Sequence, residues 1–267
     1  AKAYRKMFVP PPGYYLIEVD LSQAELRIAA CMANDKTMID IYRNNGDIHK
    51  STALIVAGVT QAQFDAFLKE KQKELRQKAK AVNFGFLYGM GWRKFIAYAK
   101  TEYNVTFTEK EAQRIRVEFF RKYRSLSRWH EAMRSFAQRH KFVRSFSGRI
   151  RHLPMIDSPE DYIQQEAGRQ AINSPVQEFG SSLGVMAQGR MNEEIDPDAL
   201  QIVGFIHDAV VAYVKKEYVD WGMRTIKRYM ETNPLEEWFG VRLQVPIIAE
   251  VGFGENLGEI HECEGFS

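Results

Sequence analysis

The sequence has little of what marks several protein classes. Only two cysteines occur among 267 residues, Cys31 and Cys263, and they are far apart with no metal-ligand spacing. This excludes a disulfide framework and fits a reducing compartment. No uninterrupted apolar run is long enough to span a bilayer, and the first residues, AKAYRKMFVPPPGYY, lack the apolar stretch of a signal peptide. We therefore expect a cytoplasmic protein with no membrane partner.

Internal repeats and low-complexity segments are also absent, and the net charge is small. A formal charge of +3 does not by itself establish a polyanionic partner. The basic residues are nevertheless unevenly distributed, in two groups: Lys69, Lys71, Lys73, Arg76, Lys78 and Lys80, and then Arg144, Arg149, Arg151 and His152. Either group could face phosphates, although such groups are more often solvated faces. With 45% apolar residues, the length fits one large domain or two closely packed ones.

The stretch RQKAKAVNFGFLYGM, residues 76–90, is the most informative part of the chain. Arg76, Lys80, Phe84 and Tyr88 recur every four residues, so on a helix they share one face. Two cations suit a phosphate group, and two aromatic rings suit a base or sugar. This face is a candidate site for a nucleoside triphosphate. The alternative is a solvated basic helix end that runs into a buried aromatic end.

Acidic residues stand at the ends of two apolar runs. In YYLIEVDLSQAELR a predicted strand ends at Asp20 and a helix follows, with Ser22 and Glu25 at the spacing of a capping box. An unpaired carboxylate at the end of a buried strand is costly unless it meets a cation or a metal. Asp20 is therefore a candidate functional residue.

The second apolar run, LQIVGFIHDAVVAYV, predicts two strands that meet at His207-Asp208. A purely structural hairpin would favour Asn-Gly or Asp-Gly at its turn, so this polar pair indicates function. Asp20 and Asp208 could bring two carboxylates to the rim of one sheet. Two hard oxygen ligands beside a triphosphate-binding helix are what paired Mg²⁺ ions, roughly 3.5 to 4 Å apart, need for phosphoryl transfer. The pattern predicts nucleotidyl transfer.

The other elements are predicted from periodicity and caps. A long charged helix is expected from about Thr60 into residues 76–90, and an amphipathic helical insertion from 89 to 139 with a capping box at Thr108 and Glu111. FVRSFSGRIRHLP predicts a hairpin with its turn at Ser147-Gly148.

The last third of the chain is expected to return to the sheet. A helix is expected from Tyr162, a restart at Ser174-Pro175, and continuation to about Glu194. A helix over about 220–230 and a last strand, VPIIAEVGFG, complete the predicted order.

Several of these stretches resemble one known family. DLSQAELR (20–27), RQKAKAVNFGFLYGM (76–90) and His207-Asp208 are similar, in order and spacing, to the three polymerase motifs of the family A DNA polymerases. GDIH (46–49), GRIRHLP (148–154), RQAINSPVQ (169–177) and EVGFGENL also resemble that family. The likeness covers nearly the whole chain, and the 76–90 motif is the specific one. It implies a DNA replication enzyme of a bacterium, or of a phage in a bacterial host.

The resemblance implies an α+β fold, an antiparallel palm sheet with a helical fingers subdomain, in a right-hand arrangement that lacks the thumb. We expect residues 1–46 and 142–267 to form the palm and residues 47–141 the fingers. Since the sequence starts just before the first motif, we expect a fragment, a processed product or one half of a split polymerase. Without a thumb, we expect low processivity. We also expect a partner, either a chain that bears a thumb or exonuclease or the remainder of a longer polypeptide.

The resemblance also implies residue roles. Asp20, Asp208 and the backbone carbonyl of Leu21 would hold two Mg²⁺ ions, for which Mn²⁺ can substitute. Arg76 and Lys80 would bind the triphosphate of the incoming dNTP, and Lys80 would donate a proton to departing pyrophosphate. The implied catalytic set is therefore Asp20, Asp208 and Lys80.

The remaining nucleotide contacts would come from five residues. Gln23 and His49 would add polar contacts to the dNTP. Phe84 would pack on its sugar and base, and Tyr88 would stand where the templating base enters. Glu25, hydrogen-bonded to Tyr88, would crowd the sugar 2′ position and exclude ribonucleotides by a steric clash.

A second set would hold primer-template DNA near the primer terminus, where minor-groove acceptors are similar for all base pairs. Its members are Arg169, Asn173, Gln177 and His207.

Two residues depart from the family pattern. Ala209 stands where members usually carry Glu, so the metal site is expected to be weaker, with Glu18 or Glu250 as candidates to compensate. Phe84 stands where some members have Tyr, which predicts discrimination against dideoxynucleotides. Ala209 and the missing thumb also support the alternative of a catalytically weak or inactive subunit that binds DNA or nucleotides.

Overall fold

The computed structural model of the protein describes residues 2–263, which form two compact units. The sheet unit comprises Ala1–Ala24, Glu178–Arg242 and Pro246–Ser267, and the helical unit comprises Glu25–Gln177 and Leu243–Val245. Their edges differ from the predicted subdomain edges at 46/47 and 141/142, and the assignment of palm and fingers stays a prediction. In the described part of the chain, no helix has both the length and the apolar character needed to cross a membrane.

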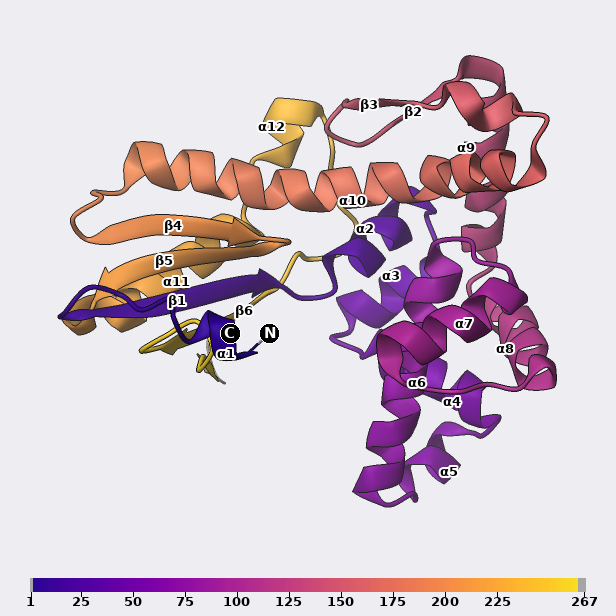
Figure 1. Ribbon diagram of the computed structural model, residues 1–267, viewed down its shortest axis with the longest axis horizontal. Coiled ribbons are helices and arrows are strands. Elements are labelled where there is room, and N and C mark those ends of the chain that lie inside the picture. Colours follow the sequence, from indigo (N-terminus) through magenta and orange to yellow (C-terminus); the bar gives the residue numbers. More distant parts are fainter. Residues whose placement is uncertain (1, 264–267) are drawn as a thin grey trace. The chain divides into compact units, whose positions relative to one another are not determined.

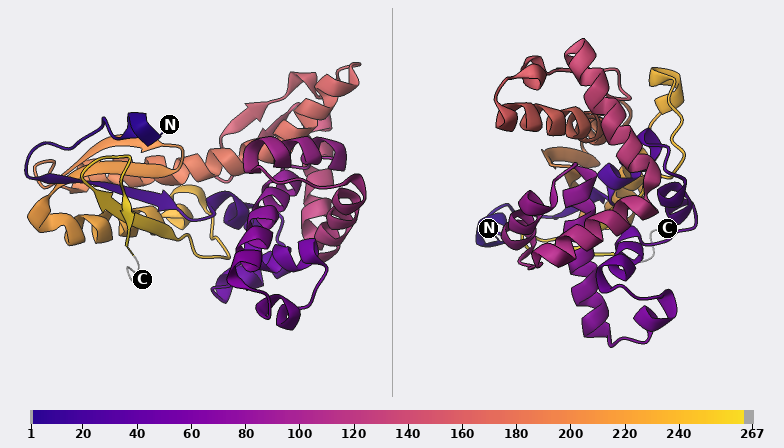
Figure 2. Two further views of the ribbon diagram at one scale, coloured as in Figure 1. Left: turned by 60° about the horizontal axis from the view of Figure 1, so that its bottom comes forward. Right: turned by 90° about the vertical axis from the view of Figure 1, so that its right-hand side faces the viewer.

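The sheet unit is built on five antiparallel strands in the order β4-β5-β1-β6-β7 (Figures 1 and 2, where β1 is indigo, β5 orange and β6 yellow). The bounds are β1 Tyr14–Leu21, β4 Leu200–Ile206, β5 Ala209–Lys215, β6 Ala249–Gly254 and β7 His261–Glu262. The apolar, β-branched sequence of β1 suits its central place, because both edges of that strand are paired. This confirms the predicted antiparallel sheet.

The sheet unit also holds the short helices α1 Lys2–Arg5 and α12 Leu235–Phe239 and the 3₁₀ turn η2 Lys216–Tyr218. One face of the sheet is covered by α11 Val219–Glu231 and the second part of α10 Asp161–Glu194. A Cβ at Gly222 of α11 would lie 2.9 Å from Val214 Cγ2 and one at Gly184 of α10 would lie 2.4 Å from Phe205, so both helices approach the strands closely. Since Val214 and Phe205 share a face by register, the side chain of Asp20 lies on the other face.

The helical unit holds the predicted insertion. Its elements are α2 Ala24–Met32, α3 Lys36–Arg43, α4 Ile48–Ala57, α5 Gln61–Asp65, α6 Lys69–Leu87, α7 Trp92–Tyr103, α8 Glu109–Lys122, α9 Arg124–His140, β2 Phe142–Arg144, β3 Ile150–His152, η1 Pro154–Asp157 and the first part of α10. α4 and α6 run side by side (Figure 1). Phe86, Phe95 and Phe119 are fully buried between the helices, and Phe95 lies so close to Gly85 that a Cβ there would be 2.7 Å away. Gly85 therefore lets α7 pack against α6.

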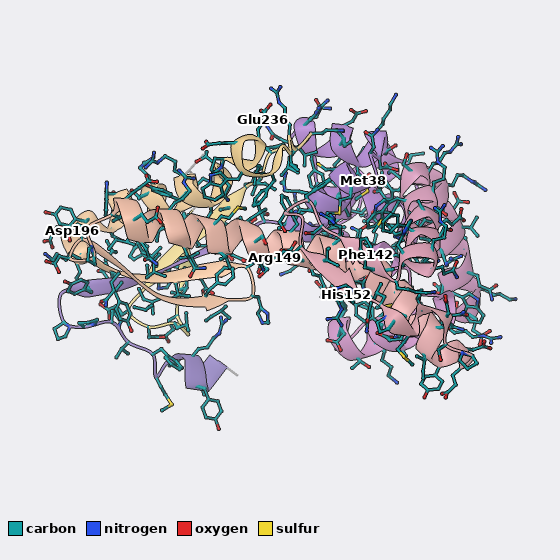
Figure 3. All side chains as sticks on the ribbon, turned by 90° about the horizontal axis from the view of Figure 1, so that it is seen from above. Met38, Phe142, Arg149, His152, Asp196 and Glu236 are labelled. Carbon is teal, nitrogen blue, oxygen red and sulfur yellow. The ribbon has the colours of Figure 1, made fainter. Side chains whose placement is uncertain are left out.

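The structure confirms several local predictions. Thr108 and Glu111 form the expected capping box of α8. β2 and β3 form the expected hairpin, with Gly148 at a φ of +84° in its turn. Figure 3 labels the cross-strand partners Phe142 and His152 and, toward the turn, Arg149.

Two helix predictions are wrong. The single helix from Thr60 is interrupted after Asp65, because Thr60 caps the short α5 and Leu68 has extended backbone before α6 begins. The restart at Ser174-Pro175 does not occur either: α10 is continuous with Pro175 inside it. Pro175 removes one hydrogen bond, but the buried neighbours of this turn, such as Val176, keep the helix in register.

α2 begins at Ala24, and the Ser22 hydroxyl donates a 2.6 Å hydrogen bond to the Glu250 carboxylate. The capping role of Ser22 stays a prediction.

Candidate functional site

A carboxylate pair lies at the rim of the sheet unit. Asp20 is the penultimate residue of β1, where its register partners are Ala209 on β5 and Glu250 on β6. His207 and Asp208 form the two-residue turn between β4 and β5, with His207 at a φ of +59°. Because β5 starts directly after Asp208 and pairs with β1, the turn brings Asp208 to Asp20.

The electrostatics of the pair differ from those of ordinary surface aspartates. Partial burial, the largest cause, and the Asp208 carboxylate, which repels the charge of Asp20 and accepts a hydrogen bond from protonated Asp20, together raise the pKa of Asp20 to about 7. Glu18 and Glu250 add smaller repulsive contributions in the same direction. Near neutral pH the two aspartates therefore share a proton, as closely spaced carboxylates do.

This donor set fits a divalent cation, since a cation would replace the shared proton and relieve the repulsion between the carboxylates. Asp20 also lines a cavity of about 290 Å³ with Glu18, Glu250 and Arg5. Within residues 2–263 no group of three or more His, Cys, Asp or Glu side chains is arranged to hold a metal. The Asp20–Asp208 pair is therefore the candidate metal site. Among the residues that the structure describes, a third carboxylate is not grouped with it, and Ala209 has no carboxylate to supply.

The basic end of α6 lies in the helical unit. Arg76 Nε donates a 2.6 Å hydrogen bond to Asp47 Oδ2, and the other oxygen of Asp47 caps α4 by accepting from the backbone N–H of His49. Burial alone would raise the pKa of Asp47, but the Arg76 guanidinium holds it below its usual value. Asp47 thus orients Arg76 and ties α4 to α6.

His49 and Lys80 lie beside this ion pair. Burial, the largest cause, and the cations Arg76 and Lys80 lower the pKa of His49 to about 4, although the Asp47 carboxylate opposes that shift. His49 is therefore neutral at pH 7. Lys80 is half-buried, and the described residues give its ammonium group no ion-pair partner. Two cations and one neutral imidazole form a small positive surface that suits a phosphate chain.

The aromatic end of α6 differs in one detail from the predicted helix. Phe84 is half-buried within α6, whereas Tyr88 follows the last helical residue as its C-cap. The Tyr88 hydroxyl donates a hydrogen bond to the Glu25 carboxylate, the contact that the sequence predicted, and also meets Gln177. The structure thus brings Glu25, Tyr88 and Gln177 together.

The predicted DNA-contacting residues of α10 form a stripe. Arg169, Asn173 and Gln177 are four residues apart and share one helix face. Arg169 pairs with Glu166 on the same helix, and Asn173 Oδ1 is buried without a hydrogen-bond partner in the described structure. Arg169 also lines a cavity of about 330 Å³ with Arg134, Gln164 and Gly89.

The predicted site residues fall in both units. Asp20, Leu21, Gln23, His207 and Asp208 belong to the sheet unit, and the others belong to the helical unit. Leu21 ends β1 and pairs with Ala249, and Gln23 has a left-handed backbone with a φ of +56°.

Sequence reasoning missed two residues that organise the helical part. Asp47 could have been found, because an Asp two residues before His49 at a helix start is the pattern of an N-cap. Asn83 is fully buried in α6 and donates to His49 Nδ1 over 2.7 Å. The sequence feature that could have revealed Asn83 is that it is the single amide side chain within the apolar run AVNFGFL.

Comparison with known proteins supports the motifs. Residues 1–259 match the model of DNA polymerase family A. DNA polymerase I of Pseudomonas aeruginosa is 31% identical over 259 residues, which are 96% of this chain and 26% of that protein. The DNA polymerase of Bacillus phage SP01 is 29% identical over 94% of this chain and 27% of its own length. The chain thus spans about a quarter of the length of these relatives.

A solved structure shows the same fold. It is the POL domain of Pol1 from M. smegmatis in complex with DNA primer-template and dNTP, with a TM-score of 0.79 at 22% identity. The superposition covers 96% of this chain and 42% of that one. The family model over nearly the whole chain, together with motifs that the fold places at a sheet rim and on a basic helix, confirms the predicted family: this chain belongs to DNA polymerase family A.

Proposed function

We propose that this chain catalyses template-directed DNA synthesis, in which the primer 3′-hydroxyl attacks the α-phosphate of a dNTP and pyrophosphate departs. The observation that carries the proposal is the proton-sharing pair of Asp20 and Asp208 at the sheet rim, within the matched family motifs. We assign the palm to the sheet and the fingers to the helices from residue 47 to 141. Its site of action would be the bacterial cytoplasm.

Two divalent cations, Mg²⁺ or Mn²⁺, are the cofactors that the carboxylate pair suits. Asp20, Asp208 and the Leu21 carbonyl would hold them. When bound, such ions lower the pKa of the attacking hydroxyl and stabilise the charge that develops on the transferred phosphate. The chain's own contribution is to keep Asp20 on β1 beside Asp208 in the turn that leads into β5, fixed by the β1–β5 ladder.

Arg76, Lys80 and His49 would bind the triphosphate. Arg76 is already oriented by Asp47 over 2.6 Å, which reduces the conformational entropy lost when a phosphate binds. Lys80 would give a proton to the bridging oxygen as pyrophosphate leaves. Gln23 would contribute a further polar contact.

The Glu25–Tyr88 hydrogen bond supports the proposed selection of deoxyribose. It fixes the carboxylate of Glu25 beside the Tyr88 ring, so that a sugar with a 2′-hydroxyl would meet it at close range. Phe84 would pack on the sugar and base. On the DNA side, His207 and the α10 stripe of Arg169, Asn173 and Gln177 would contact primer-template.

Primer extension with Mg²⁺ tests the proposal. We expect extension by the natural chain and a loss of more than about a hundredfold in Asp208→Asn, since even the outer partners of metal ligands are worth 10–100-fold. Asp198→Asn, an exposed aspartate in the turn before β4, is the matched control and should extend normally.

The same assay separates the alternatives. DNA and dNTP binding without extension under any condition would contradict catalysis and support a binding subunit, which Ala209 favours. Extension that appears only when a thumb-bearing chain is added would identify one half of a split polymerase.

A further inference from the structure

A chain of buried polar groups ends at His49. Tyr123, Thr52 and Asn83 are completely buried and His49 is 2% exposed, and they come from α4, α6 and the end of α8. Thr52 Oγ1 donates to Asn83 Oδ1 over 2.7 Å and lies 3.0 Å from the Tyr123 hydroxyl. Asn83 Nδ2 lies 2.7 Å from His49 Nδ1. In a buried setting such groups are satisfied only if each donor meets an acceptor.

The direction of these hydrogen bonds can be deduced step by step. Asn83 Oδ1 is only an acceptor, so the single hydrogen of the Thr52 hydroxyl points at it. Thr52 Oγ1 must then accept from the Tyr123 hydroxyl. The Asn83 amide, held this way round, presents its N–H to His49 Nδ1, which must offer a lone pair. The imidazole proton is therefore on Nε2.

The proton on Nε2 is important because this nitrogen lies on the side of the ring away from Asn83. Among residues 2–263, His49 Nε2 has no hydrogen-bond partner, although the side chain is almost completely buried. The charged groups around the ring are Asp47, Arg76 and Lys80. The Asp47 carboxylate is already engaged by Arg76 and by the N–H of His49, so the donor on Nε2 is left for a ligand.

We propose that Tyr123, Thr52 and Asn83 are positioning residues that hold His49 as its neutral Nε2–H tautomer, so that it donates a hydrogen bond to the triphosphate. The inference rests on the proposed function and deepens it. A phosphate oxygen is an acceptor, so the opposite tautomer would present a lone pair to it and repel it. The lowered pKa of His49 agrees with a neutral donor, since burial disfavours the imidazolium.

The tautomer can be measured without any ligand. In ¹⁵N-histidine-labelled protein at pH 7, the protonated and unprotonated ring nitrogens of His49 are well separated by NMR, and His49→Phe identifies its signals by their loss. We expect the natural chain to show Nε2–H. Thr52→Val removes the only donor that the described residues offer to Asn83 Oδ1, so the amide can turn and the Nδ1–H form should appear. Thr52→Ser keeps the hydroxyl and should retain Nε2–H.

Binding links the tautomer to the ligand. Inorganic tripolyphosphate, titrated by calorimetry, should bind Thr52→Val about tenfold more weakly than the natural chain, the size expected for one hydrogen bond to a charged group. Thr52→Ser should bind normally. Thr225→Val, a buried threonine on α11 that is 8% exposed, is the matched control for loss of a hydroxyl and should bind normally as well. Thermal melts would verify that each variant is folded.

Several outcomes would overturn the inference. They are Nδ1–H or imidazolium in the natural chain at pH 7, an unchanged tautomer in Thr52→Val, or a changed tautomer with unchanged tripolyphosphate affinity. Failure of the proposed function looks different: primer extension would be absent while the tautomer and tripolyphosphate results still follow the expected pattern.

Discussion

Asp20 is held between two opposing requirements. In its proposed role it must ionise to bind a cation, yet its burial and the neighbouring carboxylates of Asp208, Glu18 and Glu250 all disfavour ionisation. A site of this kind retains its proton until a cation or a higher pH removes it. Because the pKa is near 7, a modest change in conditions alters the state of the pair.

The first prediction concerns pH. Below about pH 7 the proton on Asp20 competes with a cation, so Mn²⁺ affinity, followed by electron paramagnetic resonance, should fall by about tenfold per pH unit and level off above pH 8. In Asp208→Asn the pKa of Asp20, followed by ¹³C NMR, should fall toward 3.8 but stay above it, because burial is the largest cause of the shift.

Glu237→Gln on the exposed α12 is the control and should leave the titration of Asp20 unchanged. A Mn²⁺ affinity that does not vary between pH 5 and 8 would show that no proton is displaced from the pair.

The second prediction concerns Phe84. A tyrosine hydroxyl at this position can stand in for the missing 3′-hydroxyl of a dideoxynucleotide, which phenylalanine cannot do. Phe84→Tyr should therefore raise the incorporation of ddNTP relative to dNTP by about tenfold or more, the value of one hydrogen bond to a charged group. Competition between ddNTP and dNTP in primer extension measures it.

Phe67→Tyr, in the link between α5 and α6, adds the same hydroxyl elsewhere and should change nothing. Equal use of both nucleotides by the natural chain would contradict the interpretation of Phe84.

At the scale of elements, the turn that follows α6 is unusually constrained. Gly89 has a φ of +69°, and a Cβ there would lie 2.9 Å from both Arg134 Nη2 and Ile172 Cδ1. His130 also contacts the end of α6, because its Nε2 lies within hydrogen-bond distance, 2.8 Å, of the Leu87 carbonyl oxygen. The turn thus fixes the end of α6, where Tyr88 meets Glu25.

The third prediction follows from that turn. Gly89→Ala should lower the free energy of unfolding by about 1–3 kcal/mol, since it combines a left-handed backbone with a steric clash. Gly91→Ala is the matched control: its φ is −71° and no atom lies within 4 Å of the added Cβ, so a change of about 0.5 kcal/mol or less is expected. Urea unfolding measures both. If both variants lost the same free energy of unfolding, a side chain at residue 89 would not strain the turn, and the prediction would be wrong.

Prediction from sequence succeeded where one local signal determines the element. The capping box at Thr108, the turn at Gly148 and the apolar run that ends at Asp20 each depend on neighbouring residues alone. It failed at Pro175, because the local signal for a helix start was overridden by tertiary burial of the surrounding turn. The break after Asp65 was missed because the lysine- and glutamate-rich sequence that follows it, residues 69–80, has high helix propensity.

Part of the candidate site could likewise be predicted from the sequence, and part could not. Asp20, Asp208 and the α6 stripe were found from spacing and from resemblance, and the Glu25–Tyr88 contact is present. The Thr52–Asn83 bond joins residues 31 positions apart, and no periodicity links them. Their pairing depends on how α4 packs on α6, which only the folded chain shows.

At the scale of the whole molecule, the two units differ in how far along the sequence their contacts reach. The helical unit is formed almost entirely by the continuous segment Glu25–Gln177, whereas the sheet unit joins three separate segments. In the sheet, β1 pairs with β5 and β6, which lie near the other end of the chain. Closing such long loops is slow, while helical contacts form quickly.

The fourth prediction is an order of folding. In pulsed hydrogen exchange during refolding, amides of α6, α8 and α9 should become protected before those of β1 and β5. Mass spectrometry of the exchanged peptides measures it. Amides of α11, which is also a local helix but packs on the sheet, serve as the internal control and should follow β1 rather than α6. Simultaneous protection of all these segments would contradict the prediction.

The central place of β1 has a further consequence during synthesis on the ribosome. The strand that carries Asp20 is translated well before both of its neighbours, β5 and β6. At the usual pace of translation β1 waits roughly ten to forty seconds for its first partner, β5, and longer for Ala249–Gly254. During that time its apolar residues have no strand partner, so the nascent chain is a natural client for a chaperone. A product cut short before residue 208 would lack the second carboxylate, so such an incomplete chain cannot assemble the pair.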